Sequence, residues 1–209
     1  MTVDSALLGF SIVAALMTLI PGVDTALILR SAIARGRGEA LLAALGICTG
    51  VFVWGVAAAA GASAILAASS LAYHVLAYAG AAYLVFLGGQ MIHRSLRGKQ
   101  LATIHVPVSH SRYRTYLTGL VTNVLNPKIG VFYIAAIPQF TPAGTNALFM
   151  GMGLSAVHVA LTLVWAVVLV YGVRIAGRWL GSAKSVSWMD RITGTVLIGF
   201  GLKVALSRP

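Results

Sequence analysis

The sequence predicts an all-α membrane protein that forms a single transmembrane domain over residues 1–209. Hydrophobic residues make up 59% of the 209 residues and charged residues only 9%, whereas soluble chains carry about 25% charged residues. The mean hydropathy is +0.91. Apolar runs of about 20 residues, the length that crosses a bilayer as a helix, recur along the chain. They are rich in Ala and Leu and do not alternate, which favours helices over strands.

Six transmembrane helices account for these runs. The boundary near residues 67–71 is weak, so five or seven spans remain alternatives. The first span ends at Leu29 or continues to Ala34, and we favour the longer helix. The predicted spans are Leu7–Leu29, Ala40–Ala67, Leu71–Ile92, Tyr116–Pro138, Ala147–Val173 and Ile192–Leu206.

Basic residues indicate the orientation of these spans. They concentrate in the first, third and fifth loops, while the amino terminus and the second and fourth loops hold none. Because short basic loops stay on the cytoplasmic side, both termini are predicted to lie outside. The same pattern explains the net charge of +11 better than nucleic-acid binding does. The loop residues are Arg30, Arg35, Arg37, Arg94, Arg97, Lys99, Arg112, Arg114, Arg174, Arg178, Lys184 and Arg191.

Several other classes of protein are not predicted. The single cysteine, Cys48, lies in an apolar segment, so neither a disulfide framework nor a metal-thiolate site is expected. The first twenty residues lack the basic start and cleavage pattern of a signal peptide and are expected to form a retained span. No GxxxxGK[ST], HExxH or GxSxG pattern occurs, and acidic residues are scarce. Neither a nucleotide-driven pump nor an enzyme with catalytic residues is therefore predicted.

Two of the predicted spans contain residues that a membrane helix tolerates poorly. The first span holds Pro21, Gly22 and Asp24, and the fourth holds Pro127 beside Lys128. Proline inside a helix costs about 3 kcal/mol, and a charge at the bilayer centre costs roughly 2.5–3.5 kcal/mol. We therefore expect helices one and four to be broken at the prolines. The two charges should point inward, to each other, to free backbone groups or to water.

The breaks occupy matching positions in two halves of three spans. Repeat one covers about residues 1–93, a basic cytoplasmic loop about 94–114, and repeat two about 115–209. Since three is odd, the second repeat enters the membrane in the inverted orientation. Broken helices at matching positions of inverted repeats indicate a transporter binding site. The alternatives are a structural ion pair between Asp24 and Lys128, and kinks that only fit neighbouring helices.

Three other features each fit two interpretations. Asn123 and Asn126 either face the solute or bond freed carbonyls between helices. His158 either carries protons or, as we favour, is a neutral ring bonded to a backbone carbonyl. The small-residue segment from Gly46 to Gly50 fits packing inside the chain or a homodimer contact. The deeper tryptophans, Trp54 and Trp165, are expected to be packing residues.

At its two broken segments the sequence resembles the LysE/RhtB family of bacterial amino-acid exporters. The segment "PGVDTALILR" matches the family's first motif, except that Val23 replaces a second proline. The segment "NPKIGVFYIAAIPQF" matches the second motif. Length, span number and the basic third loop agree as well. The matching residues of the second motif are Asn126, Pro127, Lys128, Pro138, Gln139 and Phe140.

The resemblance implies a multi-pass secondary active exporter of amino acids or similar small metabolites in the cytoplasmic (inner) membrane of a bacterium. Alternating access driven by proton exchange is expected, with membrane lipid as a partner and no cofactor, metal or nucleic acid. The alternative is a metal or inorganic ion transporter of the same superfamily, although it would want more intramembrane carboxylates or histidines. The predicted substrate and proton pathway comprises Asp24, Lys128, Asn126, Asn123, Thr25, Pro21, Gly22 and Pro127.

Overall fold

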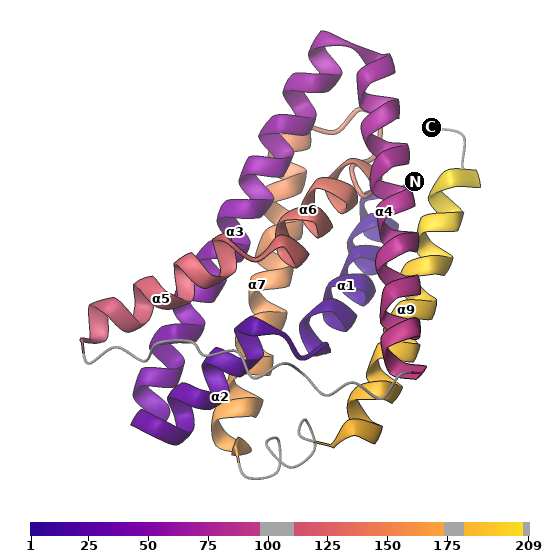
Figure 1. Cartoon of the computed structure of the whole chain (residues 1–209). Helices are drawn as coiled ribbons and strands as arrows, with labels where there is room; N and C mark the ends of the chain where they lie inside the picture. The colour runs from indigo at the N-terminus through magenta and orange to yellow at the C-terminus, as the bar shows by residue number, and fades with distance from the viewer. Residues whose placement is uncertain (97–110, 174–181, 207–209) are drawn as a thin grey trace.

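The computed structural model describes residues 1–96, 111–173 and 182–206, which form helices joined by short turns, with no strand among them (Figure 1). This confirms the all-α class for the described residues. The helices are α1 (Val3–Leu19), α2 (Val23–Arg35), α3 (Arg37–Ala68), α4 (Ser70–Leu96), α5 (Arg112–Val124), α6 (Pro127–Gln139), α7 (Ala147–Tyr171) and α9 (Ala183–Leu206).

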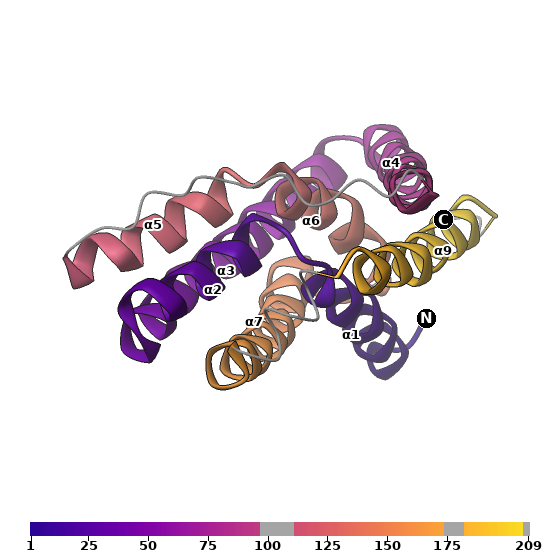
Figure 2. The same cartoon turned by 60° about the horizontal axis from the view of Figure 1, so that its bottom comes forward.

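The helices form a bundle from which α2 and α5 diverge at one end. Helix α3 packs against α7 and α5, while α4 and α9 pack side by side at the edge of the bundle (Figures 1 and 2). Helix α1 contacts both α7 and α9. The start of α1 and the end of α9 lie at the same end of the bundle (Figure 1). Helix α3 also contacts α2 and α6, and α7 contacts α2, so α3 and α7 pack against helices on both sides of the first break or the second.

Two helices of the described residues, α3 over Arg37–Ile65 and α7, are by themselves long and apolar enough to cross a membrane. The pairs α1/α2 and α5/α6 meet the same criterion as pairs but are bent by 53° and 56°. The total is two spans, or up to four if each bent pair is one span. The composition and these helices are those of a membrane protein. The count of six spans and their arrangement as inverted repeats stay predictions.

Local chemistry explains where the helices begin and end. Helix α2 ends at Arg35 because Gly36 takes φ 87°, a conformation that glycine adopts without a Cβ clash. The broken first helix thus reaches one residue beyond Ala34, which confirms the longer alternative. Ser69 separates α3 from α4, as the weak boundary predicted. Helix α9 begins at Ala183, well before the predicted Ile192.

Small residues let α3 and α5 approach each other closely. A Cβ atom at Gly46 of α3 would collide with the Tyr116 carbonyl of α5, and one at Gly119 of α5 would collide with the Ala43 carbonyl of α3. At Gly50 a Cβ atom would lie 2.7 Å from Asn123 Oδ1. The small-residue segment of α3 therefore packs inside the chain, and the homodimer stays untested.

Much of the predicted basic loop lies outside the described residues, as do residues 174–181 and 207–209. The assignment of this loop to the cytoplasmic side, like the placement of the termini, is therefore not tested by the fold. The basic residues concerned are Arg97, Lys99, Arg174, Arg178 and Arg208.

Candidate functional site

The first break occupies residues 20–22, between α1 and α2. Pro21 has no N–H group, so the Met17 carbonyl four residues earlier loses its helical donor. Gly22 is the N-cap of α2 and, having no side chain, makes no side-chain cap bond. Lys128 compensates from the other broken helix, since its ammonium donates to the Met17 carbonyl at 3.0 Å and to the Ile20 carbonyl at 3.4 Å.

The second break occupies Leu125 and Asn126, between α5 and α6. Asn126 caps α6, because its Oδ1 atom accepts from the Lys128 backbone N–H at 3.1 Å. Pro127 takes the first helical position, where a missing N–H costs nothing. The freed Val124 carbonyl accepts from Trp54 Nε1 on α3 at 3.2 Å. Trp54, predicted only to pack, thus also satisfies backbone at the break.

Asp24 lies in the first turn of α2, where the helix N-terminus favours a negative charge. Its Oδ2 atom accepts from Asn123 Nδ2 at 2.9 Å and from Asn126 Nδ2 at 3.1 Å. Its Oδ1 atom is buried and has no hydrogen-bond partner among the described residues. Both asparagines therefore bond the carboxylate of the other break, rather than freed carbonyls.

Hydrogen bonds that run from each break to the other connect the two charged residues. Lys128 of the second break bonds the carbonyls of the first, while Asp24 of the first break bonds the amides of the second. The Lys128 ammonium also acts electrostatically on the Asp24 carboxylate. Both side chains point inward, as expected from the cost of exposing a charge to lipid.

A pocket of about 40 Å³ lies where the two breaks meet. This volume holds a few water molecules and is far below the roughly 300 Å³ of a typical ligand site. Its lining combines charged and polar groups with apolar side chains. Helix α7 supplies His158, Thr162 and Trp165, and Trp165 Nε1 is a buried donor with no partner among the described residues. The apolar residues of the lining include Ile28, Ile47, Val51 and Ile129.

Each predicted pathway residue lies at this junction. Gly22, Asp24, Thr25, Asn126 and Lys128 line the pocket. Asn123 is not part of the lining but donates to the Asp24 carboxylate, which is, and the two prolines form the breaks. Their roles in transport are not tested by this geometry.

Helix α7 contributes groups that the sequence analysis left out of the pathway. Its His158 Nδ1 atom lies 3.0 Å from the Tyr133 hydroxyl, so the predicted backbone-carbonyl partner is wrong. The reason is that Tyr133 of α6 is buried against His158 and its ring stacks on the imidazole, which places the hydroxyl beside Nδ1. Polar residues at positions 158, 162 and 165 share one face of an otherwise apolar helix. That spacing was the signal that could have revealed them.

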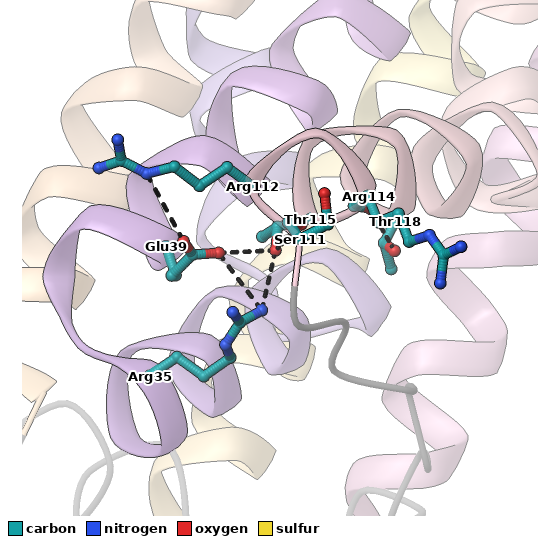
Figure 3. Close-up of polar contacts among 7 residues, drawn as sticks. All are labelled: Arg35, Glu39, Ser111, Arg112, Arg114, Thr115 and Thr118. Carbon is teal, nitrogen blue, oxygen red and sulfur yellow. Dashed lines mark hydrogen bonds and ion pairs between the residues drawn. The ribbon is translucent and has the colours of Figure 1, made fainter.

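A second polar cluster joins the outer parts of the broken helices, around Glu39 at the start of α3 (Figure 3). Glu39 Oε2 accepts from Thr115 Oγ1 of α5 at 2.7 Å and lies 3.4 Å from Arg35 Nη1 of α2. Arg112 Nε lies 3.8 Å from Glu39 Oε1, and Arg35 also donates to Thr115 at 3.2 Å. The halves of the broken helices that diverge from the bundle are thus tied to α3.

Comparisons with known proteins agree with this architecture. The family described as "LysE type translocator" matches residues 15–208. An uncharacterized membrane protein of Bacillus subtilis (strain 168), YrhP, is 32% identical over 97% of this chain and 99% of its own length. The threonine efflux protein of Escherichia coli (strain K12) is 29% identical over 90% of this chain and 91% of its own.

A leucine efflux protein of Enterobacter sp. (strain 638) is 26% identical over 90% of each chain. No solved structure matches the chain significantly. The family model spans nearly the whole length, and the predicted resemblance is confirmed. The chain therefore belongs to the LysE type translocators, a family of transporters whose members include threonine and leucine efflux proteins.

Proposed function

We propose that this chain is a secondary active exporter of amino acids or similar small metabolites, working by alternating access and proton exchange. It lies in the inner membrane of a bacterium as six spans in two inverted repeats, with both termini outside. The basic first, third and fifth loops support this orientation. The observation that carries the proposal is the reciprocal placement of Asp24 and Lys128 across two helix breaks at one pocket.

The pocket offers groups for both ends of an amino acid. A solute ammonium fits the unpartnered Oδ1 atom of Asp24, and a solute carboxylate fits the Lys128 ammonium and the unpartnered Trp165 N–H. The apolar residues of the lining suit a neutral side chain of modest size, in line with the threonine and leucine named for the relatives. These groups form the binding site once the pocket widens.

Widening is required because about 40 Å³ cannot admit an amino acid. The bends of 53° and 56° give each broken helix two halves that can move separately. The Glu39 cluster holds the α2 and α5 halves against α3 in this closed arrangement (Figure 3). Opening toward the basic-loop side separates these halves and breaks the cluster.

Reconstituted vesicles test the proposal. Vesicles loaded with L-threonine or L-leucine are expected to take up the same radiolabelled amino acid by exchange, and an imposed pH gradient should drive net movement. Empty vesicles serve as the control. Absence of exchange for a panel of amino acids that includes both would overturn amino-acid export.

The alternative of metal or inorganic ion transport has less support in the donor set. Across residues 1–96, 111–173 and 182–206, no three His, Cys, Asp or Glu side chains are grouped to hold a metal ion. Hard divalent cations are bound by several oxygen ligands, and one carboxylate lines the pocket. Uptake of Mn²⁺ by the same vesicles, without amino-acid exchange, would favour the alternative.

A further inference from the structure

We propose that His158 carries the coupling proton together with Asp24, and that Tyr133 positions it; this inference rests on the proposed proton-coupled export. Three titratable side chains, Asp24, Lys128 and His158, line the pocket within the described residues. The other polar groups on its walls are hydroxyls, an amide and an indole, which do not exchange protons near neutral pH. Imidazole is the side chain suited to that exchange.

Tyr133 fixes which nitrogen of His158 serves the pocket. Its hydroxyl lies 3.0 Å from Nδ1, and the two rings stack with centroids 5.6 Å apart at 29°. The Nδ1 atom is therefore occupied, and Nε2 is the nitrogen that remains for proton exchange. Tyr133 also interacts with Ser155 one turn away on α7, which holds the phenol in place.

Apolar rings enclose the rest of the imidazole. Phe10 and Phe132 meet it edge-on, with centroids at 6.3 Å and 5.6 Å and interplanar angles of 76° and 80°. These phenyl rings offer no hydrogen-bond partner, so the phenol of Tyr133 alone sets the ring orientation among the contacts described. The orientation of the imidazole ring is thus fixed, whereas its Nε2 atom can gain and lose a proton.

Helices α2, α3 and α6 contribute charged or titratable groups to this environment. Asp24 comes from α2, Lys128 and Tyr133 from α6, and Cys48 from α3, with its Sγ 4.0 Å from the Val159 carbonyl. The nearest α1 side chain, Phe10, does not titrate. Lys128 acts electrostatically on His158, so a protonated imidazole and the ammonium repel each other, and Asp24 is the group that balances them.

These charges give a proton-for-solute exchange. After the solute ammonium leaves Asp24 to the outside, a proton binds the unprotonated Nε2 of the neutral imidazole, whose Nδ1–H donates to the Tyr133 oxygen both before and after this step. The proton then passes from Nε2 to Asp24 Oδ1, leaving a neutral imidazole and a neutral carboxylic acid. When the pocket opens inward, the acid releases this proton and the carboxylate binds the next solute ammonium. One proton enters for each solute exported, and no redox partner is needed.

The test uses His158→Gln, Tyr133→Phe and the control Cys48→Ala, each reconstituted with L-threonine as probe. Glutamine keeps an amide for Tyr133 but holds no exchangeable proton near neutral pH. With a pH difference of about one unit, one-for-one exchange supports about a tenfold threonine ratio. The wild type and Cys48→Ala should reach it, whereas His158→Gln should fall to a ratio of about one. Threonine exchange without a pH gradient should persist in the wild type, Cys48→Ala and His158→Gln.

Tyr133→Phe should keep exchange but shift the pH profile of gradient-driven transport, since only the orienting bond is lost. A tenfold ratio with an unchanged pH profile in His158→Gln would remove His158 from the proton path while leaving export intact. If His158→Gln does not reach the membrane, an unchanged pH profile in Tyr133→Phe would overturn the proposal. Absence of exchange in the wild type would overturn the proposed function as well.

Discussion

The two helix breaks bend their chains by similar angles, 53° and 56°, but they are stabilised differently. The second break is largely completed by its own residues, because Asn126 caps α6 and Pro127 takes the position where a missing N–H is harmless. The first break has no side-chain cap at Gly22, and its freed carbonyls are bonded by Lys128 from the second. Asp24 in turn depends on two amides of the second break.

This difference indicates where the junction is vulnerable. A change at the second break removes bonds from both breaks, whereas a change at Asp24 removes charge and leaves the backbone of both breaks satisfied. Substitutions at the second break should therefore cost both stability and transport. Those at the first should cost mainly transport.

Lys128→Met is expected to have the largest effect. It leaves the Met17 and Ile20 carbonyls without this donor and Asp24 without its compensating charge, and removing one partner of buried opposite charges costs about 3–5 kcal/mol. Threonine exchange in vesicles should fall to background, and the melting temperature in detergent should drop. The matched control is Lys184→Met, an exposed lysine on α9. Exchange by Lys128→Met at the wild-type rate would contradict the model of the junction.

Asp24→Asn should distinguish the effect of the lost charge on transport from the effect of lost hydrogen bonds on stability. Asparagine can still accept from the Asn123 and Asn126 amides, so the melting temperature should drop by less than for Lys128→Met. Exchange should nonetheless be lost, because a neutral amide attracts a solute ammonium far more weakly than a carboxylate does. Asp4→Asn, at an exposed position on α1, is the control. If Asp24→Asn melted at a temperature as low as that of Lys128→Met, the proposed difference between the two breaks would be wrong.

Asn126→Ala and Asn123→Ala should differ by a smaller amount. Both lose one bond to Asp24, but Asn126 also loses the α6 cap, worth about 1 kcal/mol. Asn123 carries a buried Oδ1 atom without a partner among the described residues, so its removal also relieves a cost. Asn126→Ala should therefore melt lower. Asn146→Ala, which removes the α7 cap away from the pocket, gives the effect of a lost cap alone. Equal melting temperatures for Asn126→Ala and Asn123→Ala would refute the ranking.

Several features could be predicted from local sequence because their causes are local. Proline lacks an N–H wherever it stands, so Pro21 and Pro127 predicted the two breaks that the structure contains. The cost of a charge in lipid predicted that Asp24 and Lys128 point inward. Helix ends fixed by side chains or glycine were harder to predict. The start of α9 at Ala183 was missed because its first turns are polar and do not match the apolar pattern of a span.

What the sequence determined by itself is the class of the protein, its family and the positions of its two breaks, since hydropathy, proline geometry and motif spacing act over a few residues. Only the tertiary structure decided which partner each freed group takes. Lys128 finds carbonyls more than a hundred residues away, Trp54 finds the Val124 carbonyl, and Tyr133 finds His158. Such pairings depend on how helices cross, and crossing is set by close approach at glycines such as Gly46 and Gly119, which a linear pattern does not specify.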